Sequence, residues 1–424
     1  MSRAGGELRA PTMKNATATR TWLTQVAAAL RKTTEILAGE LAAPTNETPY
    51  WTEFEWRIAR AVSAMHGVSS LLWSGLRWEG PGSWRRFLGE QRDQSIGRHL
   101  QITHLLDAID LQAHRDGVAL VALKGAALYA AGIYAAGARP MGDVDLLVRH
   151  DDAGAIVRLL GACNYAAAFT THRHQVFLPR ARKVMTGTRL GEHVDNPIKI
   201  EVHTRIAESL PVSASDITQL LFPSVEHAGV ITYRSAASLM MHLLLHAAGN
   251  MRARALRLIQ LHDIALLSAR FAPSDWEELF AMRPNGRGLW WALAPLTLTA
   301  LYYPTTIQPA LFAHLGGECP PRLLKHVRHQ RVTDVSWSNI RIEAFPGVEW
   351  ARSSREALDF MRGRIWPSHE ARLELKQGAA QIPDSSTVPW YGISHAARIV
   401  RWVISRPPRV QTLLSVRAAL AQES

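Results

Sequence analysis

Apolar residues recur at helical spacing over the first third of the chain. In 20–42 and 52–76, apolar side chains fall three or four positions apart, which is the spacing of one helix face. The pattern continues as far as Gly117, a residue type that commonly ends helices. We therefore expect a helical N-terminal region over 19–116. Residues 1–18 are small and polar, and we expect them to form a disordered tail.

The middle of the chain, 117–233, has short apolar runs in place of long helical patterns. VALVAL (118–123) is a run of the kind that forms a buried strand. DVDLLV (143–148) predicts a second strand, and the strict alternation in PIKIEVHT (197–204) predicts another. Further strand candidates are HQVFLP (174–179) and GVITY (229–233), and helices are expected in KGAALYAAGIY (124–134) and DDAGAIVRLLGAC (151–163).

Helical spacing returns over 234–424, which we expect to be mainly helical and divided by proline breaks. Its most apolar stretch, 289–303, is too short to cross a bilayer and contains Pro295, so we expect a buried helix and no membrane span. Trp290 and Trp291 are expected to lie in the core. A strand-bearing middle flanked by N- and C-terminal helical regions predicts the α+β class.

Composition narrows the class of protein further. Hydrophobic residues make up 47% of the 424 residues, which is typical of a globular chain. The net charge of +12, carried mostly by Arg, favours a polyanionic partner such as a nucleotide or RNA, although no dense basic run marks a nucleic-acid arm. Two cysteines, Cys163 and Cys319, cannot build a disulfide scaffold or a structural zinc finger. With no apolar signal-peptide segment, a cytoplasmic protein is expected.

Two aspartates, Asp143 and Asp145, open the second predicted strand. Side chains alternate between the two faces of a strand, so both aspartates face the same side. By the same parity, Glu201 shares a face with Lys199 and His203 on the later strand. If these strands are neighbours, Glu201 joins the aspartates, and His203 is expected to support the same cleft.

Three carboxylates a few ångströms apart repel one another, by about 4 kcal/mol per pair at 4 Å and an effective dielectric near 20. Such a cluster needs a cation or a shared proton, and we expect no Lys or Arg at the centre of this face. Mg²⁺, or Mn²⁺, suits oxygen ligands and completes its shell with substrate phosphates. Asp-x-Asp pairs also occur as helix caps and loop residues. The third acid, Glu201, therefore favours a metal site formed by Asp143, Asp145 and Glu201.

Several blocks together resemble a known family. They are LKGAALY, RPMGDVDLLV, GACNYAA, KIEVHT and HLLLHAA followed by LHDIALL, in this order over about residues 100–270. This order is similar to that of the uncharacterised nucleotidyltransferases of the DNA polymerase β-type superfamily. The resemblance implies a small mixed β-sheet with helices on one face and two Mg²⁺ ions. It implies that Asp143 and Asp145 are the metal-binding pair, and that Glu201 binds the catalytic metal and helps to activate an acceptor hydroxyl.

The helix before the aspartates departs from the pattern of the superfamily, which usually carries Gly-Ser to grip the triphosphate. This chain has Lys124, Gly125 and Ala126, with no hydroxyl. Gly125 still permits close approach of the backbone, and the helix start offers free N–H groups. We expect Lys124 to supply charge to the phosphates and Arg139 to be a second phosphate contact. The alternative for each is a solvated surface side chain.

Three polar residues stand out in the later helical region. His242 and His246 are one helical turn apart, which suits zinc, but the metalloprotease Glu is absent and no third ligand is evident. We therefore expect packing or supporting roles. Asp263 interrupts an apolar helix pattern, and we expect either a buried salt bridge to Arg254 or Arg257 or a contact with substrate.

Three functions remain open from the sequence. The first is an Mg²⁺-dependent transfer of a nucleoside monophosphate from an NTP such as ATP, with release of pyrophosphate. The acceptor is then RNA, a protein, a peptide or a small molecule. The second is a metal-dependent glycosyltransferase that uses Asp-x-Asp, which leaves Glu201 unexplained. The third is a degenerate nucleotidyltransferase fold that acts as a binding protein, which the missing Ser favours and the intact acids oppose.

Overall fold

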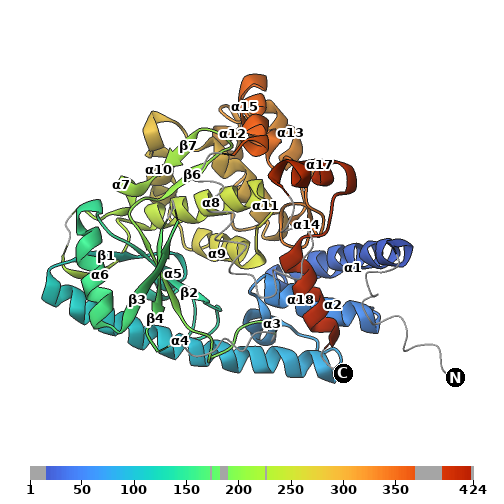
Figure 1. Ribbon diagram of the computed structural model, residues 1–424, viewed down its shortest axis with the longest axis horizontal. Coiled ribbons are helices and arrows are strands. Elements are labelled where there is room, and N and C mark those ends of the chain that lie inside the picture. The colour runs from blue at the N-terminus through green and yellow to red at the C-terminus, as the bar shows by residue number, and fades with distance from the viewer. Residues whose placement is uncertain (1–15, 172–173, 182–189, 225–226, 368–393, 422–424) are drawn as a thin grey trace.

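A computed structural model describes residues 16–171, 174–181, 190–224, 227–367 and 394–421. A six-stranded mixed sheet lies toward the left of Figure 1, with helices on both sides of it and a larger helical part to the right and above. The chain passes from helices through the sheet and back to helices. The predicted α+β class, with a strand-bearing middle region flanked by helical regions, is therefore confirmed.

Helices precede the sheet, as expected. α4 ends at Gly117, whose φ of 70° lies in the left-handed region that glycine favours. The segment 52–76 forms two helices, because Gly67, with a φ of 66°, separates them. The predicted tail, 1–18, lies outside the described residues except for its last three residues, which are helical. The bounds are α1 (Ala16–Ala42), α2 (Glu53–Met65), α3 (Ser69–Gly75) and α4 (Gly82–Asp116).

All five predicted strands are present in the sheet. Its strands are β1 (Ala119–Ala122), β2 (Asp143–Leu147), β3 (Tyr165–Thr170), β4 (Gln175–Pro179), β5 (Lys199–His203) and β8 (Gly229–Ile231). Their order is β3-β4-β5-β2-β1-β8, with β2 parallel to β5 and antiparallel to β1. The sequence missed β3, because an edge strand of small and exposed residues lacks the apolar run that marks a buried strand.

Helices α4 and α6 (Ala153–Ala162) cover one face of the sheet. Val144 and Leu146 point toward them and join one hydrophobic cluster with Ile109 of α4 and Ile156 of α6. On the opposite face, Leu147 belongs to the main core, together with residues of α5 (Lys124–Ala130) and α8 (Ala236–Arg252). Helices thus lie against both faces, whereas the resemblance implied one. The rest of the middle region contains α7 (Thr218–Leu221) and the hairpin β6 (Ala207–Ser209) and β7 (Ala214–Asp216).

The second helical region follows the sheet and includes α9 (Leu258–Ser268) and α11 (Leu293–Tyr302). Trp290 and Trp291 are buried in its core, as predicted. The apolar stretch 289–303 forms a short 3₁₀ turn followed by α11. The remaining helices are α10 (Pro273–Ala281), α12 (Ala310–Gly316), α13 (Pro321–Val327), α14 (Val332–Val335), α15 (Ser354–Ile365), α17 (His395–Ser405) and α18 (Val410–Ala421).

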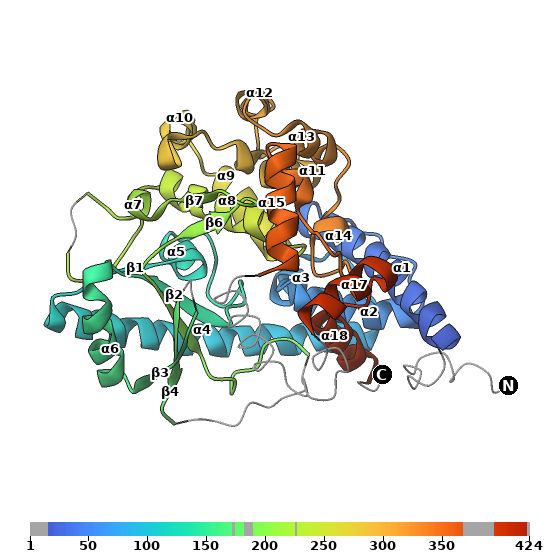
Figure 2. The ribbon, with the colours of Figure 1, turned by 45° about the horizontal axis from the view of Figure 1, so that its top comes forward.

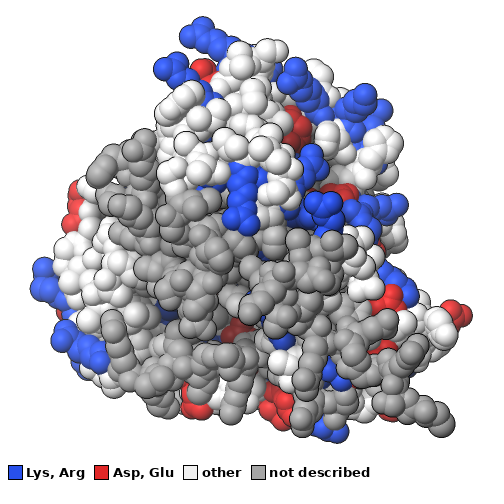
Figure 3. Space-filling view, turned by 45° about the vertical axis from the view of Figure 1, so that its right-hand side comes forward, with Lys and Arg blue, Asp and Glu red and all other residues white. Residues whose placement is uncertain are grey.

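The two helical regions are joined by a common core. Buried residues of α1, α2, α8, α9, α11 and α18 belong to one hydrophobic cluster, and α18 lies beside α2 in both ribbon views (Figure 2). None of the described helices is long and apolar enough to cross a membrane. On the face shown in Figure 3, many Lys and Arg side chains lie toward the top, where Figure 1 places α13 and α15.

Candidate active site

The predicted acidic residues come together on two neighbouring strands. β2 and β5 are paired in parallel, with Asp143 beside Lys199 and Asp145 beside Glu201. Strands β2 and β5 are therefore neighbours, and Glu201 lies on the same face as the two aspartates, as side-chain parity predicts. Asp143, Asp145 and Glu201 all line one cavity of about 260 Å³, which we call the carboxylate cavity. Its other walls come from the start of α5, the loop before β2, and helices α8 and α9.

Two lysine amines lie among the three carboxylates. Lys124 Nζ is 3.1 Å from Asp145 Oδ1. Lys199 Nζ is 3.2 Å from Glu201 Oε1 and 3.8 Å from Asp143 Oδ2. The expectation that no cation lies at the centre of this face was wrong. The face brings together three acids and two amines, so one formal negative charge remains in excess.

The two more buried of the three acids, Asp145 and Glu201, have opposite pKa shifts. Burial alone would raise the pKa of Asp145, but the charge of Lys124 and a hydrogen bond from His203 Nε2, at 3.0 Å, hold that pKa well below its usual value. For Glu201, burial and the charges of Asp145 and Asp143 raise the pKa despite the nearby Lys199. Asp145 therefore has its counter-charges in place, whereas the negative charge of Glu201 is poorly compensated.

Lys124 occupies a strained position between β1 and α5. Its φ is 48°, in the left-handed region that a non-glycine residue seldom adopts. Its backbone N–H donates to the Tyr233 hydroxyl at 3.2 Å, and that hydroxyl also bonds His242 Nδ1 at 2.7 Å. His242 thus has a supporting role, as expected. Lys124 is also less exposed than a solvated helix-start Lys, because its side chain is only 20% exposed.

Gly125 and Arg139 are packed against each other. A Cβ atom on Gly125 would lie 2.5 Å from Arg139 Nη1, so the glycine leaves room for the guanidinium. Arg139 in turn binds Asp263 through two bonds of 2.8 Å each, and Tyr134 donates to the same carboxylate at 2.6 Å. The buried salt bridge expected of Asp263 is present, but its partner is Arg139 and not Arg254 or Arg257. Arg139 and Asp263 both line the carboxylate cavity.

The structure adds two residues that the sequence analysis did not place at the site. Arg257 lines the carboxylate cavity, and burial lowers the pKa of its guanidinium. His174 Nε2 lies 3.6 Å from Glu201 Oε2. Burial and the positive charge of His203 lower the pKa of His174 to about 4. Neither residue has a motif around it, although the strand parity of β4 would have placed His174 on the face of Glu201.

Comparison with known proteins gives one family. Residues 52–300, more than half of the chain, match the family model described as uncharacterised nucleotidyltransferase. The chain belongs to this nucleotidyltransferase family. The match extends beyond the segment that resembled the family by its motifs and includes part of both helical regions. No curated protein and no solved structure matches the chain.

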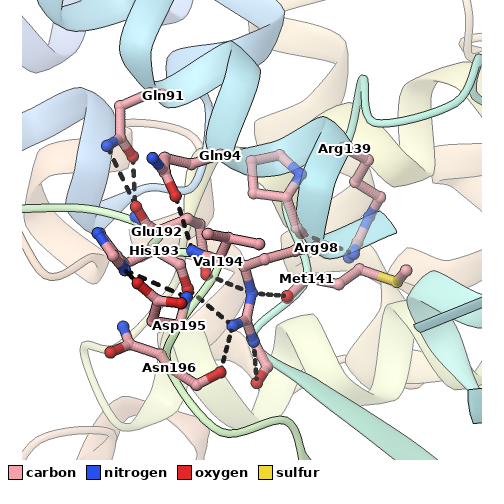
Figure 4. A network of polar contacts seen from close by, with 12 residues as sticks. Gln91, Gln94, Arg98, Arg139, Met141, Glu192, His193, Val194, Asp195 and Asn196 are labelled. Carbon is pink, nitrogen blue, oxygen red and sulfur yellow. Dashed lines mark hydrogen bonds and ion pairs between the residues drawn. The ribbon is translucent and has the colours of Figure 1, made fainter. Parts of the chain in front are cut away.

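The nucleotidyltransferase holds the start of β2 in place through one buried arginine, Arg98 of α4 (Figure 4). Its guanidinium donates to four backbone carbonyl oxygens at 2.9–3.1 Å and lies 3.2 Å from Glu192 Oε2. The four carbonyls belong to Met141, Gly142, His193 and Asn196. Because Gly142 directly precedes Asp143, Arg98 fixes the backbone that presents the first aspartate.

We expect Arg98→Lys to lower both stability and activity of this nucleotidyltransferase. An ammonium cannot reach four carbonyls at once, and each buried acceptor left without a donor costs about 1–3 kcal/mol. The free energy of unfolding should therefore fall by about 3 kcal/mol, and turnover should fall further than the folded fraction does. Chemical unfolding and pyrophosphate release measure the two effects. Arg92→Lys, on the same helix with a single carbonyl contact at 3.2 Å, is the matched control and should change neither.

A second cavity of about 160 Å³ adjoins the first and shares Lys124, Glu201, His246 and Asn250 with it. We call it the histidine cavity, because His174, His203 and His242 line it. Its wall also includes Arg205 and Glu208. In the nucleotidyltransferase, Lys124 and Glu201 therefore lie between two separate spaces.

Proposed function

We propose that the protein is a Mg²⁺-dependent enzyme, with Mn²⁺ as an alternative ion, that moves a nucleoside monophosphate from an NTP such as ATP to an acceptor and releases pyrophosphate. The observation that carries this proposal is the parallel register that sets Asp145 directly beside Glu201, with Asp143 at the same cavity. Family membership supports nucleotidyl transfer over the glycosyltransferase alternative. The three intact acids favour an active enzyme over a degenerate binding protein.

The donor set at this face suits a hard divalent cation. Asp143, Asp145 and Glu201 supply only oxygen ligands, and their charge exceeds that of Lys124 and Lys199. When bound, such an ion polarises the phosphoryl oxygens and lowers the pKa of an attacking hydroxyl. Asp143 and Asp145 would hold it from β2, and Glu201 from β5. Glu201, with its raised pKa, is also suited to accept the proton of the acceptor.

The carboxylate cavity is the proposed NTP site. Lys124, Arg139 and Arg257 line it and supply positive charge for the phosphates. Gly125 also lines the cavity, but the space beside its Cα is taken by the Arg139 guanidinium. Because α5 is in addition only seven residues long, side-chain cations carry more of the phosphate binding than the helix start does. Lys124 would leave Asp145 as the ion binds, and turn to a phosphate. His203 would then keep Asp145 oriented.

The histidine cavity is the proposed acceptor side, because Glu201 lines both this cavity and the proposed NTP site, so an acceptor there lies next to Glu201. RNA, a protein, a peptide or a small molecule are all candidates, and the excess of Lys and Arg favours acceptors with negative charge. We also propose a cytoplasmic location, because Cys163 and Cys319 are free thiols. As domain limits we propose 19–116, 117–233 for the catalytic core, and 234–424.

The test is incubation of the purified protein with each labelled NTP and Mg²⁺, in the presence and absence of cellular RNA, protein and metabolite extracts. We expect pyrophosphate release that depends on the divalent ion, and label transferred to one extract fraction. Transfer of the labelled sugar from a sugar nucleotide to an extract fraction, with release of the nucleoside diphosphate and no pyrophosphate from NTPs, would instead support a glycosyltransferase. Tight NTP binding without turnover in any extract would support a binding protein.

Lys124 gives a prediction that separates charge from backbone strain. Lys124→Ala and Lys124→Gly both remove the amine, and each should weaken NTP binding roughly 10–100-fold, the loss of one charge-assisted contact of about 1.5–3 kcal/mol. Lys124→Gly should be the more stable of the two, because glycine adopts a φ of 48° without strain. Calorimetric titration and thermal melts measure these effects. Unchanged NTP affinity in both folded variants would remove Lys124 from the site.

A further inference from the structure

Three potential metal ligands meet beside the predicted Mg²⁺ site, and two of them are imidazoles. His174, Glu201 and His203 each place one ligand atom within 4.8 Å of the other two. The sheet register explains why. β4 and β5 are antiparallel with Gln175 opposite Val202, so His174 comes beside His203, and both project on the face of Glu201. The imidazole rings lie with their centroids 5.1 Å apart.

We propose that His174, Glu201 and His203 bind one divalent transition-metal ion, with Zn²⁺ as the probe of choice, next to Asp145. This ion would be held by nitrogen as well as oxygen ligands, unlike the Mg²⁺ proposed beside it. This inference rests on the proposed function in that Glu201 belongs to both sites. Imidazole ligands suit zinc and related metals, whereas Mg²⁺ takes oxygen ligands, so the set selects against Mg²⁺.

The spacing between His174 and Glu201 supports a shared ion. Their Nε2 and Oε2 atoms are 3.6 Å apart, longer than a hydrogen bond. In a tetrahedral site with ligand distances of about 2.0–2.2 Å, two ligand atoms lie about 3.4 Å apart. The pair therefore already has nearly the separation that an ion between the two atoms requires. The described residues make no hydrogen bond to the ring of His174.

The lysines of the site leave room for such an ion. Lys199 bonds Glu201 through Oε1, whereas the other oxygen, Oε2, faces His174. An ion on Oε2 therefore does not displace Lys199. Without an ion, His203 Nε2 donates to Asp145 at 3.0 Å. A small rotation of the ring would give up this hydrogen bond and turn Nε2 toward Zn²⁺, so His203 would orient Asp145 only while the Zn²⁺ site is empty. The cluster also lines the histidine cavity, which gives a route of entry.

The test measures metal binding alone, without NTP or turnover. The full-length protein is stripped with a chelator, and Zn²⁺ affinity is measured by competition with a chromophoric chelator, with Mn²⁺ and Mg²⁺ as comparison ions. We expect one Zn²⁺ per chain and a higher melting temperature on binding. His174→Ala and His203→Ala should each weaken Zn²⁺ at least roughly 10-fold, the lower bound for losing even an outer-shell partner of a metal.

His246→Ala is the matched control, because His246 lines the same cavity outside the cluster. It should leave the Zn²⁺ affinity unchanged. Before the titrations, each variant is shown to have the same melting temperature as the wild-type protein, with both in chelator. Zn²⁺ affinity that is equal in the wild-type, His174→Ala and His203→Ala proteins overturns the inference, as does stoichiometry that falls equally in all three histidine variants. If the histidine variants bind Zn²⁺ as the wild-type protein does but pyrophosphate is still released, the metal site is ruled out and the proposed function stands. If Zn²⁺ binds at the three residues but no pyrophosphate is released, the proposed function is ruled out and the metal site stands.

Discussion

Asp145→Asn should reduce nucleotidyl transfer by roughly 10³-fold or more and also lower the melting temperature. Metal stabilisation of the transition state is worth several kcal/mol, and each 1.36 kcal/mol is a tenfold change in rate. The stability effect comes from Lys124, which would lose its partner in a site where both side chains are at least 80% buried. Leaving one charge of a buried pair alone costs about 3 kcal/mol. The repulsion among the three acids expected from the sequence is therefore outweighed at Asp145 by its pairing with Lys124.

Asp143→Asn is the matched control for this stability effect. The same substitution, two residues earlier on the same strand, removes an acid that is 42% exposed and lies 3.8 Å from Lys199. It should lose activity but melt close to the wild-type protein. Both melts are recorded in chelator, so that metal binding does not contribute, and turnover is recorded with Mg²⁺. Equal turnover per folded molecule in the wild-type protein and Asp145→Asn would rule out a metal ligand at this position.

Glu201→Gln should reduce turnover by a similar factor while it keeps or raises stability. Burial of Glu201, together with repulsion from Asp145 and Asp143, raises its pKa despite its attraction to Lys199. A neutral glutamine of the same shape removes that repulsion. We expect the free energy of unfolding at neutral pH to rise by about 1–2 kcal/mol, a fraction of the Coulomb energy of one such pair. A large loss of stability together with turnover in proportion to the folded fraction would indicate a structural role.

The pH dependence of stability, compared between the wild-type protein and Glu201→Gln, checks this repulsion independently. The pKa of Glu201 is raised in the folded protein above its ordinary value of 4.5, so the folded state holds this proton more tightly than the unfolded state does. The stability from this group is therefore fully present below the unfolded pKa and is lost as the pH rises through the folded pKa. Glu201→Gln has no titrating group at this position, so its stability does not fall in this way as the pH rises. Melts in chelator from pH 4 to pH 8 should show the variant gaining on the wild-type protein as the pH increases.

The sequence by itself determined five of the six strands of the sheet and the side of the strands on which the acids lie. Alternation along DVDLLV and KIEVHT placed Asp143, Asp145 and Glu201 on one face, because side-chain direction in a strand depends only on position along the chain. Gly117 as a helix end and the α+β class followed from equally local rules. The sequence did not predict β3, because its exposed, alanine-rich residues have no such pattern.

The tertiary structure alone decided which charges meet. Lys124 comes to Asp145, Arg139 to Asp263, and His174 to Glu201. Lys124 and Asp145 are 21 positions apart in the chain, and Arg139 and Asp263 are 124 apart, so no periodic pattern connects them. These contacts depend on the parallel register of two strands and on how α8 and α9 pack over one end of the sheet, because a salt bridge requires a few ångströms of proximity that sequence spacing does not encode.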